Sequence, residues 1–291
     1  MAINCDQSQS RILQHKHIIT ACTKMEFSQQ VRQELVKTLT TSAGGSTEEL
    51  NSALRLLSKW RSVLIQNTYL QKEGTSVYSG PLKGLSYLEQ SSEGCHVAKL
   101  LGCYEQPIHS HLEQLAQINY EKILNIGCAE GYYAVGLARL FPSASCMAFD
   151  INPTARKACE SLAIKNKVKN RLEVNKKFSS SGFYQFKNKR TLVFCDIEGA
   201  ELELFNQQIT PALVDMDLII ESHECIKPGI TECLVSRFSS THDIAIVRDS
   251  GSRNLAKMPH WFENLSHLDQ LLAVWEWRSG PTPWLIMRAK S

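Results

Sequence analysis

The chain has 291 residues, of which 43% are hydrophobic and 21% charged, and its formal net charge is +3. This composition excludes a disordered chain, and no run approaches the roughly 20 apolar residues that a membrane helix needs. The N-terminal run MAINCDQSQSR lacks the apolar centre of a signal peptide. The ten cysteines form no C-x-x-C pair, which argues against the commonest zinc and redox sites and favours a reducing compartment. We therefore expect a cytoplasmic protein with no membrane partner.

The first 115 residues have helical periodicity and few strand signals. One helix is predicted through residues 27–39. A second begins at Thr47, where Ser46 and Glu49 form a capping box, and a third begins at Pro107. Between them, the segment 77–105 starts with a run rich in glycine and tyrosine, and we expect it to cap a pocket. Residues 1–115 are assigned to a helical N-terminal region, through which we expect a homodimer.

From residue 121 onward, apolar strands alternate with helices. The predicted strands are 122–127, 144–151, 171–175, 191–197, 217–223, 243–248 and 284–289, and helices are predicted at 132–141, 153–166, 199–206 and 228–238. Strands that are apolar almost throughout and alternate with helices indicate a parallel sheet covered on both faces. Residues 116–291 are therefore assigned to one α/β domain.

The run Asn125-Ile126-Gly127-Cys128-Ala129-Glu130-Gly131 joins a predicted strand to a predicted helix. Glycines allow the backbone to turn sharply and to approach a ligand, and the helix start supplies free N–H groups. Asp150 ends the second strand, nineteen residues after Gly131, where a carboxylate accepts the hydroxyls of a ribose. The spacing is not G-x-G-x-x-G, which disfavours a dinucleotide. Glu130, without a basic neighbour in the loop, suits a cofactor with a cationic end.

This constellation resembles the class I S-adenosylmethionine-dependent methyltransferases, whose first motif reads E/D-x-G-x-G-x-G; here Asn125 replaces the acidic residue and Ala129 the middle glycine. The resemblance implies a Rossmann-like fold, with a seven-stranded, mostly parallel sheet, helices on both faces and a helical N-terminal extension. It implies that S-adenosyl-L-methionine is the cofactor and S-adenosyl-L-homocysteine its product. The implied cofactor-binding residues are Asn125, Gly127, Cys128, Ala129, Glu130, Gly131, Tyr132, Asp150, Ile151 and Asp196.

Polar side chains also follow the fourth and fifth predicted strands, in the runs Asp196-Ile197-Glu198-Gly199-Ala200-Glu201 and Glu221-Ser222-His223-Glu224. The carboxyl ends of strands meet at one edge of an α/β sheet, so we expect both runs to share a crevice with the glycine loop. The first run resembles the FkbM-type methyltransferases, which act mainly as O-methyltransferases. That resemblance covers roughly residues 77–291.

Methyl transfer to a hydroxyl requires the oxygen to lose its proton as it attacks. His223 titrates near neutrality and is the predicted general base, with Asp196 and Glu224 as further catalytic residues. Alternatively, Asp196, Glu198, His223 and Glu224 hold Mg²⁺ or another divalent metal ion, which would lower the pKa of the hydroxyl. Glu201 is predicted to stabilise a helix N-terminus, and Glu276 to pair with Arg278.

The predicted function is therefore the O-methylation of a small natural-product or sugar-like molecule. An N-methylating enzyme, a non-catalytic methyltransferase-like protein and, less well supported, an NAD-type oxidoreductase stay open. A nucleic-acid methylase is suggested by residues 155–190, which carry a net charge of +9. However, no N/D-P-P-Y/W motif follows the fourth strand, and residues 191–291 carry −6, part of which converges on the crevice. This charge distribution favours a small methyl acceptor over nucleic acid.

Overall fold

The computed structural model describes residues 23–40, 46–89, 91, 95–278 and 280–290. The chain divides into two compact units, Met1–Arg61 and Ser62–Ser291. The boundary expected at residue 115 follows the change from helices to strands, whereas the division into compact units falls after Arg61. Residues 62–115 are thus part of the same compact unit as the sheet.

The first unit contains α2 (Thr23–Thr40) and the beginning of α3 (Thr47–Glu73). Within this unit, Trp60 Nε1 donates a hydrogen bond to Ser28 Oγ over 3.2 Å and so joins the two helices. Both helices were expected from the spacing of their apolar residues. The homodimer expected through this region stays a prediction.

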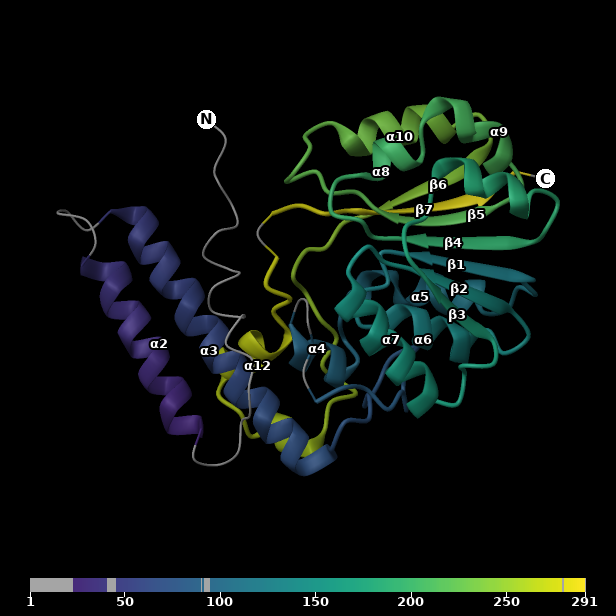
Figure 1. The fold of residues 1–291 in the computed structure, drawn as a ribbon. Coiled ribbons are helices and arrows are strands. Elements are labelled where there is room, and N and C mark those ends of the chain that lie inside the picture. Colours follow the sequence, from purple (N-terminus) through teal and green to yellow (C-terminus); the bar gives the residue numbers. More distant parts are fainter. Residues whose placement is uncertain (1–22, 41–45, 90, 92–94, 279, 291) are drawn as a thin grey trace. The chain divides into compact units, whose positions relative to one another are not determined.

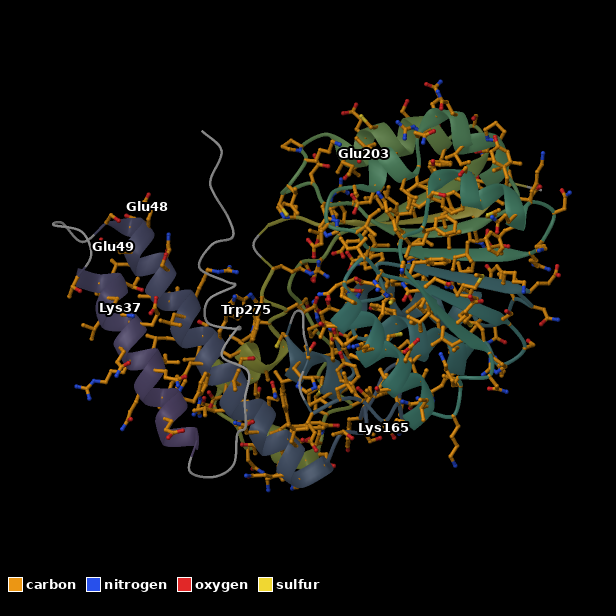
Figure 2. All side chains as sticks on the ribbon, viewed as in Figure 1. Lys37, Glu48, Glu49, Lys165, Glu203 and Trp275 are labelled. Carbon is orange, nitrogen blue, oxygen red and sulfur yellow. The ribbon has the colours of Figure 1, made fainter. Side chains whose placement is uncertain are left out.

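The start of α3 is fixed by reciprocal side-chain bonds. The N–H of Ser46 donates to Glu49 Oε2 over 3.0 Å, and the N–H of Glu49 donates to Ser46 Oγ over 3.3 Å. Figure 2 labels Glu49 at this end of the helix. The predicted capping box is confirmed. Further along α3, Leu50 and Leu54 are 60% and 64% exposed.

The second unit is built on a seven-stranded sheet with the order β3-β2-β1-β4-β5-β7-β6. Its strands are β1 (Lys122–Ile126), β2 (Ser145–Phe149), β3 (Leu172–Asn175), β4 (Thr191–Cys195), β5 (Asp217–Glu221), β6 (His242–Val247) and β7 (Trp284–Ala289). β7 is antiparallel to both of its neighbours, and the remaining strand pairs are parallel. The class I methyltransferase fold expected from the sequence is confirmed.

Helices cover both faces of this sheet, as Figure 1 shows. The apolar cluster on one face includes residues of α4 (His96–Leu101), α5 (His109–Leu115), α6 (Tyr132–Leu140), α7 (Pro153–Lys165), α11 (His260–Glu263) and α12 (His267–Val274). The cluster on the other face includes residues of α8 (Glu201–Leu204), α9 (Thr210–Leu213) and α10 (Ile230–Phe238), and of the 3₁₀ turns η2 (Ser180–Phe186) and η3 (Gln207–Ile209). A third 3₁₀ turn, η1 (Gln106–Ile108), leads into α5. Within the described ranges, no helix is long and apolar enough to cross a bilayer.

The strands of this sheet bury alternate side chains in the two clusters, as their period of two requires. In β1, Ile123 belongs to the cluster beside α6, and Leu124 and Ile126 to the cluster beside α10. The sequence did not predict α4, α9, α11 or α12. These helices have only four to eight residues, too few for a clear apolar period.

Six strands, β1 to β6, have their carboxyl ends at the same edge of the sheet. The antiparallel β7 begins at that edge. The strand order reverses between β1 and β4, because β2 and β3 lie on one side of β1 and the later strands on the other. In open α/β sheets, ligands bind outside the carboxyl ends at such a reversal. A ligand site is therefore expected at the loops that follow β1 and β4.

Candidate functional site

The glycine loop after β1 packs directly against the end of β4. Gly127 has a φ of +83°, and a Cβ atom there would lie 1.6 Å from the carbonyl oxygen of Asp196. Gly131 has a φ of +100°, and a Cβ atom there would lie 2.9 Å from Cys159 Sγ. Both positions therefore require glycine. Ala129 has a φ of +43°, in the left-handed region where glycine is favoured, at a cost of about 1 kcal/mol.

The carboxylate of Asp150, predicted to bind a ribose, holds this loop. Its Oδ2 accepts a hydrogen bond from the N–H of Ala129 over 2.9 Å, and its Oδ1 accepts one from the N–H of Asn152 over 2.7 Å. A carboxylate has about four acceptor positions, so two stay available for the hydroxyls of a ribose. The adjacent Ile151 is 78% exposed, at the position expected to contact the cofactor.

Asn125 lies in β1 just before the loop and is 2% exposed. Its Nδ2 donates to the carbonyl of Phe194 over 3.4 Å, and no group in the described part of the chain donates to its Oδ1. An orphaned buried acceptor costs free energy unless a ligand or water supplies a donor. A cofactor with an ammonium group would supply such a donor. The acceptors at this loop, Asn125 Oδ1 and the Asp150 carboxylate, therefore fit S-adenosylmethionine. Cys128, also expected at the cofactor, is buried, with its thiol 3.6 Å from the carbonyl of Ala129.

Glu130, expected beside the cationic end of the cofactor, forms a different contact. It is 1% exposed, and its Oε1 lies 2.9 Å from Lys99 Nζ and 2.6 Å from Ser91 Oγ. The hydroxyl of Tyr87 also donates to the same oxygen. The charge that Glu130 was expected to offer the cofactor is thus balanced by Lys99. Tyr132, another expected cofactor contact, is buried, and its ring packs edge-on against Tyr87.

Further bonds anchor the predicted cap segment to α7. Lys165, which Figure 2 labels on α7, donates to the carbonyl of Tyr87 over 2.7 Å and to Thr75 Oγ1 over 3.0 Å. Asn166 exchanges two hydrogen bonds of 2.9 Å with the backbone of Ser86. This end of the cap segment is thus fastened to the sheet domain by several polar contacts.

His223 follows β5 and is surrounded by carboxylates. It is 4% exposed, and its Nδ1 lies 2.8 Å from Glu201 Oε1. Because an ionised carboxylate can only accept, Nδ1–H is the donor in this bond. The opposite ring nitrogen, Nε2, lies 3.5 Å from Asp196 Oδ1, 3.4 Å from Glu198 Oε2 and 3.9 Å from Glu221 Oε2.

The carboxylates determine the charge of this imidazole. Burial by itself lowers the pKa of His223, but the hydrogen bond to Glu201 and the negative charges of Glu221, Glu201 and Glu198 outweigh burial and raise the pKa above its ordinary value. These carboxylates therefore stabilise the protonated form of His223 more than water does, and Glu201 fixes the orientation of the ring.

Two acidic residues form contacts that were not predicted. Glu201 lies in the first turn of α8, as expected, and accepts from the N–H of Gly199 over 3.1 Å, but it is also fully buried and binds His223. Glu224 was expected among the catalytic and metal-binding residues. Its Oε2 instead accepts from the N–H and hydroxyl of Thr231, over 3.1 and 2.7 Å, and its Oε1 accepts from the N–H of Gly229. These bonds cap α10 and lower the pKa of Glu224.

Among the described residues, one group has the arrangement of a metal site. It consists of Asp196, Glu221 and His223, whose candidate ligand atoms all lie within 4.8 Å of one another. Oxygen and imidazole nitrogen suit several divalent ions. Glu221 was not in the predicted set, although it ends β5 two residues before His223, and Glu224, which was in that set, is not in this group.

The sequence also did not predict how far the cluster extends from Glu221. Arg278, from the chain before β7, donates to Glu221, lies 3.0 Å from Glu105 Oε1 and lies 3.1 Å from Glu276 Oε2. The predicted pair of Glu276 and Arg278 is confirmed. Buried Glu105 also accepts a bond of 2.5 Å from the hydroxyl of Tyr133 in α6.

Neither a protein-family model nor a curated protein matches the chain. Several solved structures are similar to it, at 10–14% identity. The O-methyltransferase TomG from Streptomyces achromogenes, in complex with SAM, matches with a TM-score of 0.43, 10% identity, and coverage of 77% of this chain and 96% of that one. The cofactor-bound protein Rv0187 from MTB matches with a TM-score of 0.43 and 14% identity, and the match covers 64% of this chain and 81% of that one. A precorrin-6y C5,15-methyltransferase from Geobacter metallireducens matches with a TM-score of 0.38 and 11% identity, and the match covers 62% of this chain and 87% of that one. At such scores the fold assignment rests on the strand order of this chain.

Proposed function

We propose that the protein is an S-adenosylmethionine-dependent methyltransferase that methylates a hydroxyl of a small molecule, with His223 as general base. One observation carries the proposal. The loop suited to the cofactor packs on the backbone of Asp196, and the side chain of Asp196 lies 3.5 Å from His223 Nε2. The groups that would hold the methyl donor and activate the acceptor thus meet at one residue. The run from Asp196 to Glu201 supports the FkbM-type resemblance.

Three parts of the chain would hold the cofactor: the backbone at Gly127, the Asp150 carboxylate and the unpaired Oδ1 of Asn125. S-adenosylmethionine, when bound, supplies an electrophilic methyl group on a sulfonium centre. The chain would contribute a rigid loop, an acidic site that suits a positively charged donor, and a base that faces the acceptor.

His223 can act as a base only after it loses the Nε2 proton. Glu201 keeps the other nitrogen protonated, and so directs the lone pair of neutral His223 toward Asp196 and Glu198. Because the surrounding carboxylates raise the pKa of His223, the active neutral form accumulates only as the pH rises above the ordinary pKa of a histidine, about 6.5. The rate should therefore rise with pH through this elevated pKa.

A second candidate is a metal-assisted methyltransferase, favoured by the close approach of Asp196, Glu221 and His223. A divalent ion there would occupy Nε2 and lower the pKa of the acceptor hydroxyl directly. His223 would then be a ligand and not a base.

The cofactor assignment predicts that Asp150→Ala weakens binding of S-adenosylmethionine at least about 100-fold, because charged hydrogen bonds contribute about 1.5–3 kcal/mol each. Isothermal titration calorimetry on the full chain measures this. Asp150→Asn retains an acceptor for the N–H of Ala129, so it should lose less affinity for S-adenosylmethionine than Asp150→Ala. Asp243→Ala, an exposed aspartate of β6, is the control. Unchanged affinity in Asp150→Ala would refute the proposed cofactor site.

The base assignment predicts that the pKa of His223 lies above 6.5 and falls in Glu198→Gln, because Glu198 is one of the charges that raise it. NMR titration of histidine-labelled protein measures this pKa directly. Glu203→Gln is the matched control, since Glu203 is an exposed residue of α8, labelled in Figure 2. If His223 had the same pKa in wild type, Glu198→Gln and Glu203→Gln, the assignment would be contradicted. Adding Mg²⁺ separates the two candidates, because only a metal ligand should shift its resonances as the ion saturates.

A further inference from the structure

A cavity of about 1200 Å³ is lined by Glu224, which follows His223 in the chain, and by Arg278, which donates to Glu221. Four segments line it: the N-terminal half of α10, the chain from the end of β6 to Arg253, the end of α12, and the chain that leads into β7. The ends of β6 and the start of β7 lie at the same edge of the sheet as the glycine loop. The cavity is larger than many ligand pockets, which range from roughly 300 to 1,000 Å³.

The floor of this cavity carries two guanidinium groups whose nitrogens are already bonded within the protein. Arg253 lies 2.6 Å from Asp249 Oδ2 and also donates to Asp249 Oδ1 and Glu276 Oε1. Arg278 donates from Nε to Glu276 and from its two terminal nitrogens to Glu221 and Glu105. An anionic ligand would have to displace these carboxylates to reach either arginine.

Carboxylates outnumber guanidiniums in this network, since Glu105, Glu221, Asp249 and Glu276 share two arginines. Burial, followed by the nearby charge of Glu221, raises the pKa of Glu105 to about 8. With Glu105 protonated at neutral pH, the three carboxylates of Glu221, Asp249 and Glu276 still outnumber the two arginines. Glu224 also lines the cavity, and so do Glu232 and Arg248, which are both exposed, so that solvent screens both of their charges.

The walls, in contrast, are largely apolar. The apolar residues that line them are Val235 of α10, Leu271 and Leu272 of α12, Trp275 and Pro283. Aliphatic and aromatic walls bind an apolar body, and an indole face attracts a cation.

Arg278, which lines the cavity, connects it to the proposed base through Glu221. Glu221 Oε1 accepts from Arg278 on the cavity floor, and Glu221 Oε2 lies 3.9 Å from His223 Nε2. We propose that this cavity is the methyl-acceptor site, and that it selects an acceptor with an apolar body and a protonated amine near the hydroxyl that is methylated. This inference rests on the proposed function, because the acceptor role requires a bound methyl donor.

Three probes of equal length test the charge selection by calorimetry on the full chain: 4-phenylbutylamine, 4-phenylbutanol and 4-phenylbutyrate. The amine should bind at least tenfold more tightly than the alcohol, and the carboxylate should bind more weakly than either. A carboxylate that binds as tightly as the amine, or an alcohol that matches the amine, would overturn the inference.

Two leucines of α12 offer a matched pair of variants, since Leu268 and Leu271 are each 64% exposed and only Leu271 lines the cavity. Leu271→Arg adds bulk and positive charge and should weaken binding of the amine at least tenfold, whereas Leu268→Arg should leave it unchanged. An equal effect of the two substitutions would place the amine elsewhere and overturn the inference.

Binding of S-adenosylmethionine, measured in the same proteins, separates this inference from the proposed function. If wild-type protein does not bind S-adenosylmethionine, the proposed function fails, and the acceptor role of the cavity fails with it. If it binds S-adenosylmethionine but shows no preference for the amine, only the inference about the acceptor fails.

Discussion

Lys99→Met should lower the free energy of unfolding by about 3–5 kcal/mol, the range for removing one partner of a buried ion pair. Lys99 and Glu130 have side chains that are 5% and 1% exposed. Methionine preserves much of the length of the lysine side chain, so the loss arises mainly from removing the positive charge that balances Glu130. Urea denaturation of the full chain measures the change. Lys157→Met, at an exposed position of α7, is the control and should change stability by less than about 0.5 kcal/mol.

The pH dependence of this loss distinguishes charge from packing. Without Lys99, burial raises the folded-state pKa of Glu130 above its unfolded value, so the folded state takes up the proton more readily. The variant should therefore regain stability as the pH falls and lose it as the pH rises. Lys99→Met combined with Glu130→Gln should cost less than the two single substitutions together. A deficit independent of pH, with additive single effects, would show that Lys99 acts by packing alone.

His223→Ala should slow methyl transfer by about 10²–10⁴-fold, the range that a positioned general base contributes, while binding S-adenosylmethionine like wild type. The ring of His223 contacts Glu201, Asp196, Glu198 and Glu221, none of which belongs to the glycine loop. Transfer of a tritiated methyl group to a panel of phenols, sugars and amino alcohols measures activity, and calorimetry measures cofactor binding.

His267→Ala is the matched control for this experiment, since His267 is an exposed residue at the start of α12. It should retain wild-type activity. Wild-type turnover by His223→Ala would remove the histidine from the mechanism. Loss of cofactor binding in His223→Ala would instead show that the residue supports the fold of the crevice.

The parts of the site that sequence analysis located depend on local backbone requirements. Gly127 and Gly131 need positive φ angles and leave no room for a side chain, and a strand followed by a glycine turn and a helix is visible in the sequence. Asp150 was identified by its place at the end of the next strand, and its carboxylate does contact the loop. Short runs of apolar residues likewise indicated the seven strands, and period-3.6 patterns indicated the longer helices.

Burial and charge pairing could not be derived in the same way. Glu201 looks like an ordinary acidic residue at a helix start, yet the fold buries it and places its carboxylate against His223. Lys99, in the apolar run His96–Leu101, did carry a signal, because a lone charge among buried residues needs a partner. Nothing in the sequence identified Glu130, 31 positions away, as that partner.

The sequence by itself determined the alternation of strands and helices, the glycine loop, the carboxylate at the end of β2 and the polar runs after β4 and β5. Only the tertiary structure decided that Glu130 is neutralised by Lys99, that Glu224 caps α10, and that Glu221 joins His223 to Arg278 of the cavity floor. The physical reason is the range of the forces involved. Backbone conformation depends on neighbouring residues, whereas the energy of a buried charge depends on groups that the fold brings within a few ångströms.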